Sequence, residues 1–260
     1  MGFTIGTVGE ASGGGNQNRA RICHDQDDCL KHGLRVTCRV MTLTLYAHPF
    51  SSYCQKVLIP LYEAGTDFDY RELSPEAPEN GAELAAHWPI GRFPVLVDGA
   101  RTLIESSIII EYLDRHHPGP APMIPGEADD ALEIRFLDRF FDNYVMTPMQ
   151  RIVADFMRAP EARDPQTVAE AKAMLDKAYA WLEARLGEDA WIGGAGFTLA
   201  DCAAAPSLFY ADWVHPMDET LHPKARAYRA RLLARPSIAR TVDEARPFRP
   251  YFPPGAPDRD

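Results

Sequence analysis

The apolar positions of this chain follow clear periods from about Met41 onward and no sustained period before it. Residues 1–40 combine scattered charges with a run of three glycines, a composition that cannot offset the entropy cost of ordering the chain. We expect these residues to form a disordered leader. Met41 stands directly before the first clear strand, so it is an alternative start of the native protein.

Residues 41–117 alternate between strand and helix periods. Residues 43–46 alternate as a buried strand, and an apolar repeat at helical spacing then leads from Ser51 to Gly65, a residue type that commonly ends helices. Further elements are expected as a strand at 67–73, a short helix at 79–88, a hairpin at 95–104 and a helix at 105–116. The order β-α-β-α-β-β-α predicts a small α/β domain.

Beyond this domain only helical periods appear. A Pro- and Gly-containing stretch at residues 118–127 is expected as a linker. The helices are expected near 129–157, with a bend at Thr147-Pro148, and near 164–186, 198–213, 222–234 and 237–245. These helices predict an all-helical domain over residues 128–246, followed by a C-terminal tail at 247–260.

Charge and composition narrow the classes of partner. The chain has 37 acidic and 27 basic side chains, and its net charge of −10 argues against nucleic acid or an anionic membrane surface. It has no apolar run of about 18 residues and no secretory pattern, so we expect a cytoplasmic protein. Cysteines and histidines in the leader match no compact zinc spacing, so we expect no metal; these are Cys23, His24, Cys29, His32 and Cys38.

The turn after the first strand carries the most informative polar residues. Ser51 and Ser52 stand where the first helix begins, beside N–H groups that have no partner within a helix. The positive end of the helix dipole lies at the same place, which favours an anion. A simple helix cap is the alternative role for these serines. A hydrolase with Ser51 as nucleophile and His48 as base is disfavoured, because no G-x-S-x-G elbow surrounds Ser51.

Four motifs, in the same order and spacing, resemble the cytosolic glutathione transferase family, and most closely its serine-type, bacterial-like members. They are the strand, loop and first helix at 45–57, the segment expected to carry a cis-proline at 91–96, the Glu-Ser turn at 104–108 and the capping motif at 198–201. The resemblance covers the chain from Met41 to about Pro247. It implies a thioredoxin-like N-terminal domain followed by an all-α C-terminal domain.

At the thiol end of glutathione, the resemblance implies that Ser51 is the catalytic residue. Redox relatives carry Cys-Pro-Tyr-Cys where this chain has Ser51-Ser52-Tyr53-Cys54, so the attacking cysteine is replaced and dithiol exchange loses its nucleophile. Ser51 would instead donate a hydrogen bond to the thiolate of glutathione, which is then the nucleophile. Ser52 and Tyr46 are alternative donors, and we expect Cys54 to be buried packing.

The remaining site residues would hold the peptide part of glutathione. Glu105 would meet the ammonium group, while the hydroxyl and N–H of Ser106 would hold the γ-glutamyl carboxylate. Phe93, before a cis Pro94, would pair its main chain with the cysteinyl unit, as an added strand does. Arg92 would approach the glycyl carboxylate, and Ser52 also belongs to this binding set.

The implied activity is the transfer of glutathione, as co-substrate, to a small hydrophobic electrophile, a detoxification reaction carried out by a homodimer. The electrophile would lie between the domains, against side chains of the helical domain; the candidates are Phe140, Tyr144, Met149, Phe209 and Trp213. A non-catalytic binding or regulatory protein is one alternative. A glutathione-dependent isomerase or dehalogenase is another, although Tyr53-Cys54-Gln55 departs from the Ser-Cys-Ser-Trp pattern of maleylacetoacetate isomerases.

Overall fold

A computed structural model describes residues 43–260, and residues 41–260 form one compact unit. The predictions made for residues 1–40, a disordered leader without a metal site, lie outside the described residues.

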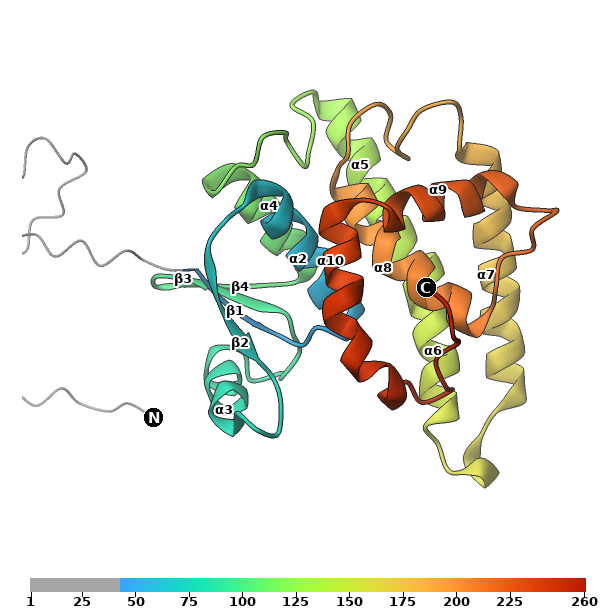
Figure 1. The fold of residues 1–260 in the computed structure, drawn as a ribbon, viewed down its shortest axis with the longest axis horizontal. Helices are drawn as coiled ribbons and strands as arrows, with labels where there is room; N and C mark the ends of the chain where they lie inside the picture. Colours follow the sequence, from blue (N-terminus) through green and yellow to red (C-terminus); the bar gives the residue numbers. More distant parts are fainter. Residues whose placement is uncertain (1–42) are drawn as a thin grey trace, which may run out of the picture. The chain divides into compact units, whose positions relative to one another are not determined.

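The first part of this unit builds a four-stranded sheet in the order β2-β1-β3-β4 (Figure 1). Its strands are β1 (Leu43–Ala47), β2 (Phe68–Glu72), β3 (Val95–Asp98) and β4 (Arg101–Ile104). β2 runs parallel to β1, whereas β3 is antiparallel to both β1 and β4. The mixed sheet follows from the chain order, because β2 returns to β1 through a helix and β4 follows β3 through a tight hairpin.

Three helices accompany the sheet: α2 (Ser52–Ala64), α3 (Pro78–His87) and α4 (Ser106–His116). α2 ends where predicted, at Gly65, whose φ of 62° is the left-handed conformation that glycine adopts without steric cost. Every residue from Cys54 to Leu61 is buried, because α2 packs against α4 on one side and against α8 and α10 of the helical part on the other. This helix therefore connects the two halves of the core.

The second part is all helical, as predicted. Its α-helices are α5 (Ala128–Phe140), α6 (Thr147–Phe156), α7 (Pro165–Arg185), α8 (Leu199–Val214), α9 (Pro223–Leu233) and α10 (Pro236–Ala245). α8 is the central one, buried over its whole length up to Trp213. The capping motif at its start is present, because Asp201 accepts the backbone N–H of Thr198 at 2.9 Å and the Tyr228 hydroxyl at 2.6 Å. The domain boundaries at residues 117, 128 and 246 stay predictions.

The helix expected over residues 129–157 is interrupted. A π-helical segment, η1 (Phe141–Met146), separates α5 from α6. Pro148 has no N–H to donate, and the backbone N–H of Thr147 reaches back to the Asp142 carbonyl, five residues earlier. The bend predicted at Thr147-Pro148 thus takes the form of a wider helical turn ahead of the proline. Short 3-10 turns complete the fold at η2 (Pro160–Ala162) and η3 (Arg246–Tyr251).

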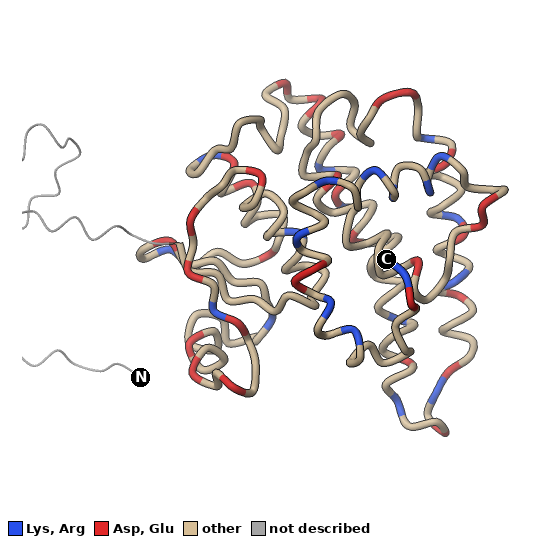
Figure 2. Tube along the Cα trace, in the orientation of Figure 1, with Lys and Arg blue, Asp and Glu red and all other residues tan. Residues whose placement is uncertain are grey.

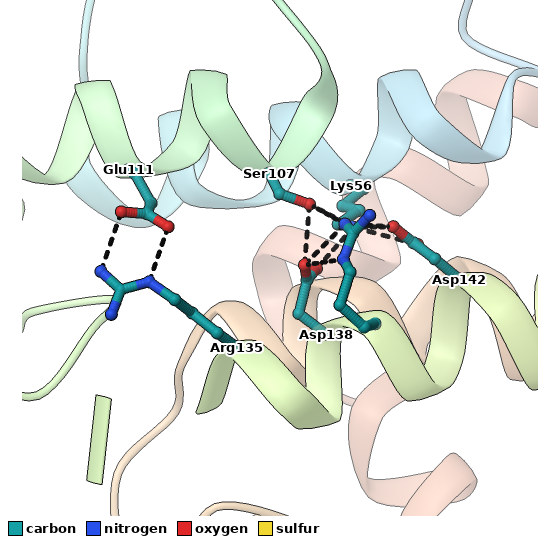
Figure 3. Close-up of polar contacts among 7 residues, drawn as sticks. Lys56, Ser107, Glu111, Arg135, Asp138 and Asp142 are labelled. Carbon is teal, nitrogen blue, oxygen red and sulfur yellow. Dashed lines mark hydrogen bonds and ion pairs between the residues drawn. The ribbon is translucent and has the colours of Figure 1, made fainter. Parts of the chain in front are cut away.

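A buried cluster of charged residues joins the sheet-bearing part to the helical part (Figure 3). The Lys56 side chain on α2 is 1% exposed, and its Nζ lies 2.6 Å from Asp138 Oδ1 and 2.8 Å from Asp142 Oδ2. It also donates to Ser107 Oγ on α4 at 3.1 Å. Arg139 donates to both aspartates at 2.7 Å from the more exposed side. Four segments of the fold are therefore tied together by one ion-pair network.

Charged residues elsewhere are spread over the surface. In Figure 2, basic and acidic positions are interspersed along the described part of the chain, on both the sheet-bearing and the helical part. No helix among residues 43–260 is long and apolar enough to cross a membrane.

Candidate functional site

A cleft of about 760 Å³ opens between the sheet-bearing part and the helical part. One wall is formed by the start of α2, the turn before β3 and the start of α4, and the other by residues of α5, η1, α6, α8 and the C-terminal segment. All seven predicted site residues line this cleft; they are Ser51, Ser52, Arg92, Phe93, Pro94, Glu105 and Ser106. Residues from three separate motifs thus meet in one place.

Ser51 is the N-cap of α2, with extended backbone angles and its Oγ 3.4 Å from the backbone N–H of Cys54. As a cap, Oγ accepts this hydrogen bond, and its own proton has the Cys54 thiol as a neighbouring acceptor within the protein. Ser52 is the first helical residue and is buried, although it also lines the cleft. Ser51 therefore places a hydroxyl at the edge of the cleft, beside the positive end of the α2 dipole.

The loop before Ser51 is held by two residues that sequence reasoning missed. Gln55 donates to the carbonyl of Pro49 and to the Tyr210 hydroxyl, both at 3.0 Å. The Tyr210 hydroxyl donates in turn to the carbonyl of Phe50 at 3.0 Å. The signal in the sequence was a polar side chain in the middle of an apolar helical segment, Gln55 in α2 and Tyr210 in α8. Tyr210 comes from α8, so the helical part fixes the loop that carries Ser51.

His48 completes this loop without acting as a base. Its Nδ1 accepts the backbone N–H of Phe50 at 3.1 Å, which requires the neutral ring nitrogen. Burial lowers the pKa of His48 below its ordinary value, in agreement with that role. His48 does not line the cleft, and among the described residues its ring does not pair with the Ser51 hydroxyl.

Two other candidate groups for thiol chemistry face elsewhere. The Tyr46 hydroxyl donates to Glu83 Oε2 at 2.8 Å, and burial together with this carboxylate raises the pKa of Tyr46 to about 12. Tyr46 does not line the cleft. Cys54 is fully buried, and burial raises the pKa of its thiol to about 12, so it stays protonated. The expectation that Cys54 is packing is confirmed.

The turn before β3 carries the predicted cis peptide bond between Phe93 and Pro94. Phe93 forms no main-chain hydrogen bond to a turn or cap in the described chain, and it lines the cleft. Its N–H and C=O are therefore available to an extended ligand. Arg92 is exposed at the same edge and has no ion pair among the described residues.

Glu105 and Ser106 form the start of α4. Glu105 has a φ of 68°, a conformation that costs a non-glycine residue about 1–3 kcal/mol and that concentrates at functional sites. Its carboxylate has no ionic partner among residues 43–260, while Ser106 is buried as the first residue of the helix. A free carboxylate thus stands next to free helical N–H groups, which suits a ligand that carries both an ammonium and a carboxylate.

The helical wall differs from the expectation. Of the five side chains expected there, Met149 lines the cleft. Phe140 packs on Trp181 with ring centres 4.2 Å apart, Phe209 and Trp213 are buried, and Tyr144 is exposed outside the cleft. The buried aromatic residues follow helical spacing because they belong to the core. The apolar residues that line the cleft on the helical side are Met149, Val153, Ala154, Met157, Tyr210, Tyr251, Phe252 and Pro253.

Charged groups of the buried cluster reach the same cleft. Arg139 and Asp142 line it, and burial raises the pKa of Asp142 above its ordinary value even though Lys56 opposes this shift. Burial also raises the pKa of Tyr53 to about 12, so its hydroxyl stays neutral. No group of His, Cys, Asp and Glu residues within the described range has the arrangement of a metal site.

Comparison with known families finds two matches along the chain. Residues 45–121 match the family model described as glutathione S-transferase, N-terminal domain, and residues 165–231 match the corresponding C-terminal domain. Glutathione S-transferase 3 of Zea mays is 30% identical over 212 residues, which cover 77% of this chain and 93% of the relative. A stringent starvation protein A homolog of Coxiella burnetii is 31% identical over 170 residues, 64% of this chain and 75% of that protein.

Solved structures give the same result for the fold. A glutathione S-transferase from Methylobacterium radiotolerans, in complex with glutathione sulfonate, superposes with a TM-score of 0.67 at 28% identity and covers 77% of this chain and 94% of its own. Another from Methylobacillus flagellatus, with GSH bound, gives a TM-score of 0.68 at 25% identity over 77% and 98% of the two chains. Both domain matches, the sheet order and the helical second part agree. The chain belongs to the glutathione S-transferase family.

Proposed function

We propose that the cleft binds glutathione and stabilises its thiol as a thiolate, which then attacks a small hydrophobic electrophile. The observation that carries this proposal is the convergence of three motifs on one cleft: the Ser51 cap, the Phe93–Pro94 turn and the Glu105–Ser106 helix start. Together they offer a hydrogen-bond donor for the thiolate, a stretch of main chain that can pair with an extended ligand, and a turn suited to the ammonium and carboxylate groups of an amino acid. Solved relatives that hold glutathione or its sulfonate support the same ligand.

The proposed glutathione orientation follows from the charge of each group. Glu105 receives the ammonium group, and Ser106 with the α4 N-terminus receives the γ-glutamyl carboxylate. Phe93 pairs its main chain with the cysteinyl unit, and Arg92 approaches the glycyl carboxylate. The thiol then lies near Ser51, with Ser52 beside it. Each ionic group of the tripeptide meets a residue of opposite charge or a set of free donors.

The thiol requires a lowered pKa to be reactive at neutral pH. A free thiol has a pKa of about 8.5, and lowering it by about two units requires roughly 2.7 kcal/mol. One hydrogen bond to a charged group supplies about 1.5–3 kcal/mol. The dipole of α2 adds about 0.3–1 kcal/mol. The Ser51 hydroxyl and the helix N-terminus together are sufficient, so no side chain has to hold the proton as a general base.

The chemical step then takes place on the ligands. The thiolate sulfur donates an electron pair to an electrophilic carbon, a sulfur–carbon bond forms, and the leaving group departs with the bonding electrons or the carbanion formed by addition takes a proton from water. Tyr251, Met149 and Phe50 offer an apolar surface for the electrophile. This reaction corresponds to a detoxification role in the cytoplasm, and it uses glutathione as co-substrate without a metal.

A homodimer is part of the proposal. Apolar side chains stay exposed along α4, α5 and η1, outside the cleft; they are Ile108, Leu132, Phe136 and Tyr144. Such a surface is suited to association with a second copy of the chain. Sedimentation equilibrium of the wild type and of a Leu132→Glu variant tests this, because the charge should shift the protein towards monomer.

The second candidate is a binding or regulatory protein that holds glutathione without turnover. It is favoured by sequence similarity to proteins that are not named as transferases, among them the Coxiella homolog described above. A glutathione-dependent isomerase is the third candidate, since a probable maleylacetoacetate isomerase of Vibrio cholerae is 28% identical over 215 residues, 80% of this chain and 99% of that protein. Both candidates share the proposed glutathione orientation and differ from the transferase in the fate of the bound thiolate.

The deciding experiment combines binding with turnover. Isothermal titration with glutathione measures binding, and a panel of an aryl halide, an alkyl peroxide, a mixed disulfide and a cis-dienoic acid measures the reaction. We expect binding and aryl conjugation that Ser51→Ala impairs far more than Tyr46→Phe, because Tyr46 lies outside the cleft. Binding without any turnover would support the regulatory candidate. Absence of glutathione binding would refute the proposal.

A further inference from the structure

A second cavity, of about 710 Å³, lies on the far side of the Pro49 loop from the cleft. It is open to the surface, like the cleft, and is lined by the end of α2, strand β2, α10 and the beginning of η3. Its size is within the range of small-molecule sites, about 300–1,000 Å³. Nothing in the proposed transferase reaction uses this cavity.

The walls of this cavity are largely aromatic. Phe68 lies between two tyrosines, with ring centres 6.3 Å from Tyr62 and 6.3 Å from Tyr70. Phe248 also lines the cavity, from the C-terminal segment. Edge and face contacts with such rings favour a flat aromatic ligand.

One buried polar group in this wall lacks a partner. The hydroxyl of Tyr70 is buried and forms no hydrogen bond with any described residue. An unsatisfied buried hydroxyl costs about 1–3 kcal/mol, so such groups normally have a partner in the functional state of a protein. Because this oxygen has almost no accessible surface, a ligand in the pocket would contact the ring of Tyr70 and not its hydroxyl.

The charges around the cavity are unbalanced. Arg240 is already engaged, because its guanidinium lies 3.8 Å from the Tyr62 ring centre and donates to Glu244 at 2.9 Å. Asp67 and Glu72 also line the cavity and have no ion pair within the described residues. The free carboxylates make the local potential negative, which attracts a cation and repels an anion.

We propose that this cavity is a second ligand site, selective for a flat aromatic molecule that carries a positive charge, and that its occupancy is coupled to the cleft. The aromatic rings pack on the ligand, and Asp67 and Glu72 balance its charge.

The two sites share their dividing wall. Pro49 lines the second cavity, whereas the next residues, Phe50 and Ser51, line the cleft. Phe248 lines the second cavity and contacts the ring of His48, with ring centres 4.6 Å apart, and this same ring accepts the Phe50 N–H. A ligand that packs on Pro49 and Phe248 therefore acts on the loop that borders the thiol site.

The test uses the full chain and two probes of the same ring system and opposite charge, 9-aminoacridine as the cation and acridine-9-carboxylate as the anion. We expect the cation to bind with one-to-one stoichiometry and at least ten-fold more tightly than the anion. Asp67→Asn and Glu72→Gln should each weaken cation binding about three-fold or more. Asp67 is exposed, and neither carboxylate has an ion pair among the described residues, so both variants should retain the fold, which circular dichroism checks.

Matched controls separate this site from the cleft. Glu79→Gln removes an exposed carboxylate of α3, and Ser106→Ala alters the cleft; neither should change cation binding. Binding that is insensitive to both cavity variants, or equal binding of the two probes, would overturn the second site. These measurements need no glutathione, so they stand or fall independently of the transferase proposal.

The coupling half of the inference rests on the proposed function. Saturating 9-aminoacridine should change the Kd of glutathione at least two-fold, and glutathione should change the Kd of 9-aminoacridine by the same factor. An unchanged Kd for glutathione while the cation is bound would refute the coupling. Loss of the effect in His48→Asn, whose side chain lines neither site, with cation binding retained, would assign the coupling to the shared wall.

Discussion

The two walls of the cleft differ in how they are built. The sheet-side wall consists of three short motifs, each positioned by its own turn or helix start: Ser51–Ser52, Arg92–Pro94 and Glu105–Ser106. The helical wall collects single side chains from α5, η1, α6, α8 and the C-terminal segment. The first wall is local in the sequence, whereas the second depends on how distant helices pack. A ligand site can thus combine a sequence-encoded half with a half that only the tertiary structure defines.

The largest expected effect is at Lys56, where the two walls are joined. Replacing Lys56 by Met leaves Asp138 and Asp142 buried without their main cation, and removing one partner of a buried ion pair costs about 3–5 kcal/mol. We expect a loss of this size in the free energy of unfolding, measured with urea. A loss of this size would show that the contact between the sheet-bearing part and the helical part depends on this buried ion-pair cluster.

The matched control for Lys56 is the neighbouring pair in Figure 3, Glu111 and Arg135. It is also an ion pair between a basic side chain and a carboxylate, with Arg135 donating to Glu111 at 2.9 Å, but the Arg135 side chain is 40% exposed. Arg135→Met should therefore cost at most about 1 kcal/mol. Equal losses for the two variants would contradict the special importance of the buried cluster.

The next effect concerns the sheet-side wall. Glu105→Gln and Ser106→Ala each remove a hydrogen bond to a charged group of glutathione, a contribution of about 1.5–3 kcal/mol. We expect the Kd of glutathione to rise by about ten-fold to a hundred-fold in each variant, as measured by isothermal titration. The control Glu79→Gln, on α3, should leave the Kd unchanged. A Kd that stays constant in both site variants would show that this turn does not hold the ligand.

The helical wall should respond differently. Met149→Ala and Tyr251→Ala remove apolar surface that faces the cleft, so the KM for a hydrophobic electrophile should rise several-fold while the Kd of glutathione stays constant. Phe209→Leu is the comparison within the core, because Phe209 was expected in the wall and is buried instead. It should lower stability without a selective change in KM. If Met149→Ala and Tyr251→Ala raised the Kd of glutathione as much as the KM for the electrophile, the helical wall would not bind the electrophile alone, as proposed.

The same division explains what the sequence could predict. The strands and the Gly65 helix end follow from local patterns, the cis peptide before Pro94 follows from the family resemblance, and the structure confirms them. The electrophile wall could not be predicted, because helical spacing identifies a buried face but not whether it borders core or cleft. Tyr251 stands in a Pro-rich tail with no period at all, and only the tertiary structure brings it to the cleft.

The position of the break in the long helix could be predicted from the sequence, but its form could not. Pro148 signals a break, but the form of that break, a π-helical segment that brings Asp142 and Asn143 into the cleft, depends on contacts with α8 and on Lys56. Gln55 and Tyr210 are a similar case. Both side chains are visibly polar in the sequence, but only the structure shows that they donate hydrogen bonds to the carbonyls of Pro49 and Phe50 in the loop before α2.

The smallest expected effect is a pH dependence of stability at His48. Burial lowers the pKa of His48, so between that value and the ordinary 6.5 the unfolded chain binds more protons than the folded one. Stability contributed by neutral His48 is complete above about pH 6.5 and is lost as the pH falls through the lowered pKa. The urea midpoint should fall between about pH 7 and pH 5, and His48→Asn should reduce that slope. An unchanged slope would place the titrating group elsewhere.

The central claim is that Ser51 stabilises a thiolate held by the sheet-side wall. The measurement that tests it most directly is the ultraviolet absorbance of bound glutathione thiolate as a function of pH, in the wild type and in Ser51→Ala. The account predicts an apparent thiol pKa of about 6.5 in the wild type and a rise of about one to two units in the variant, with glutathione still bound. The same pKa in both proteins would contradict it.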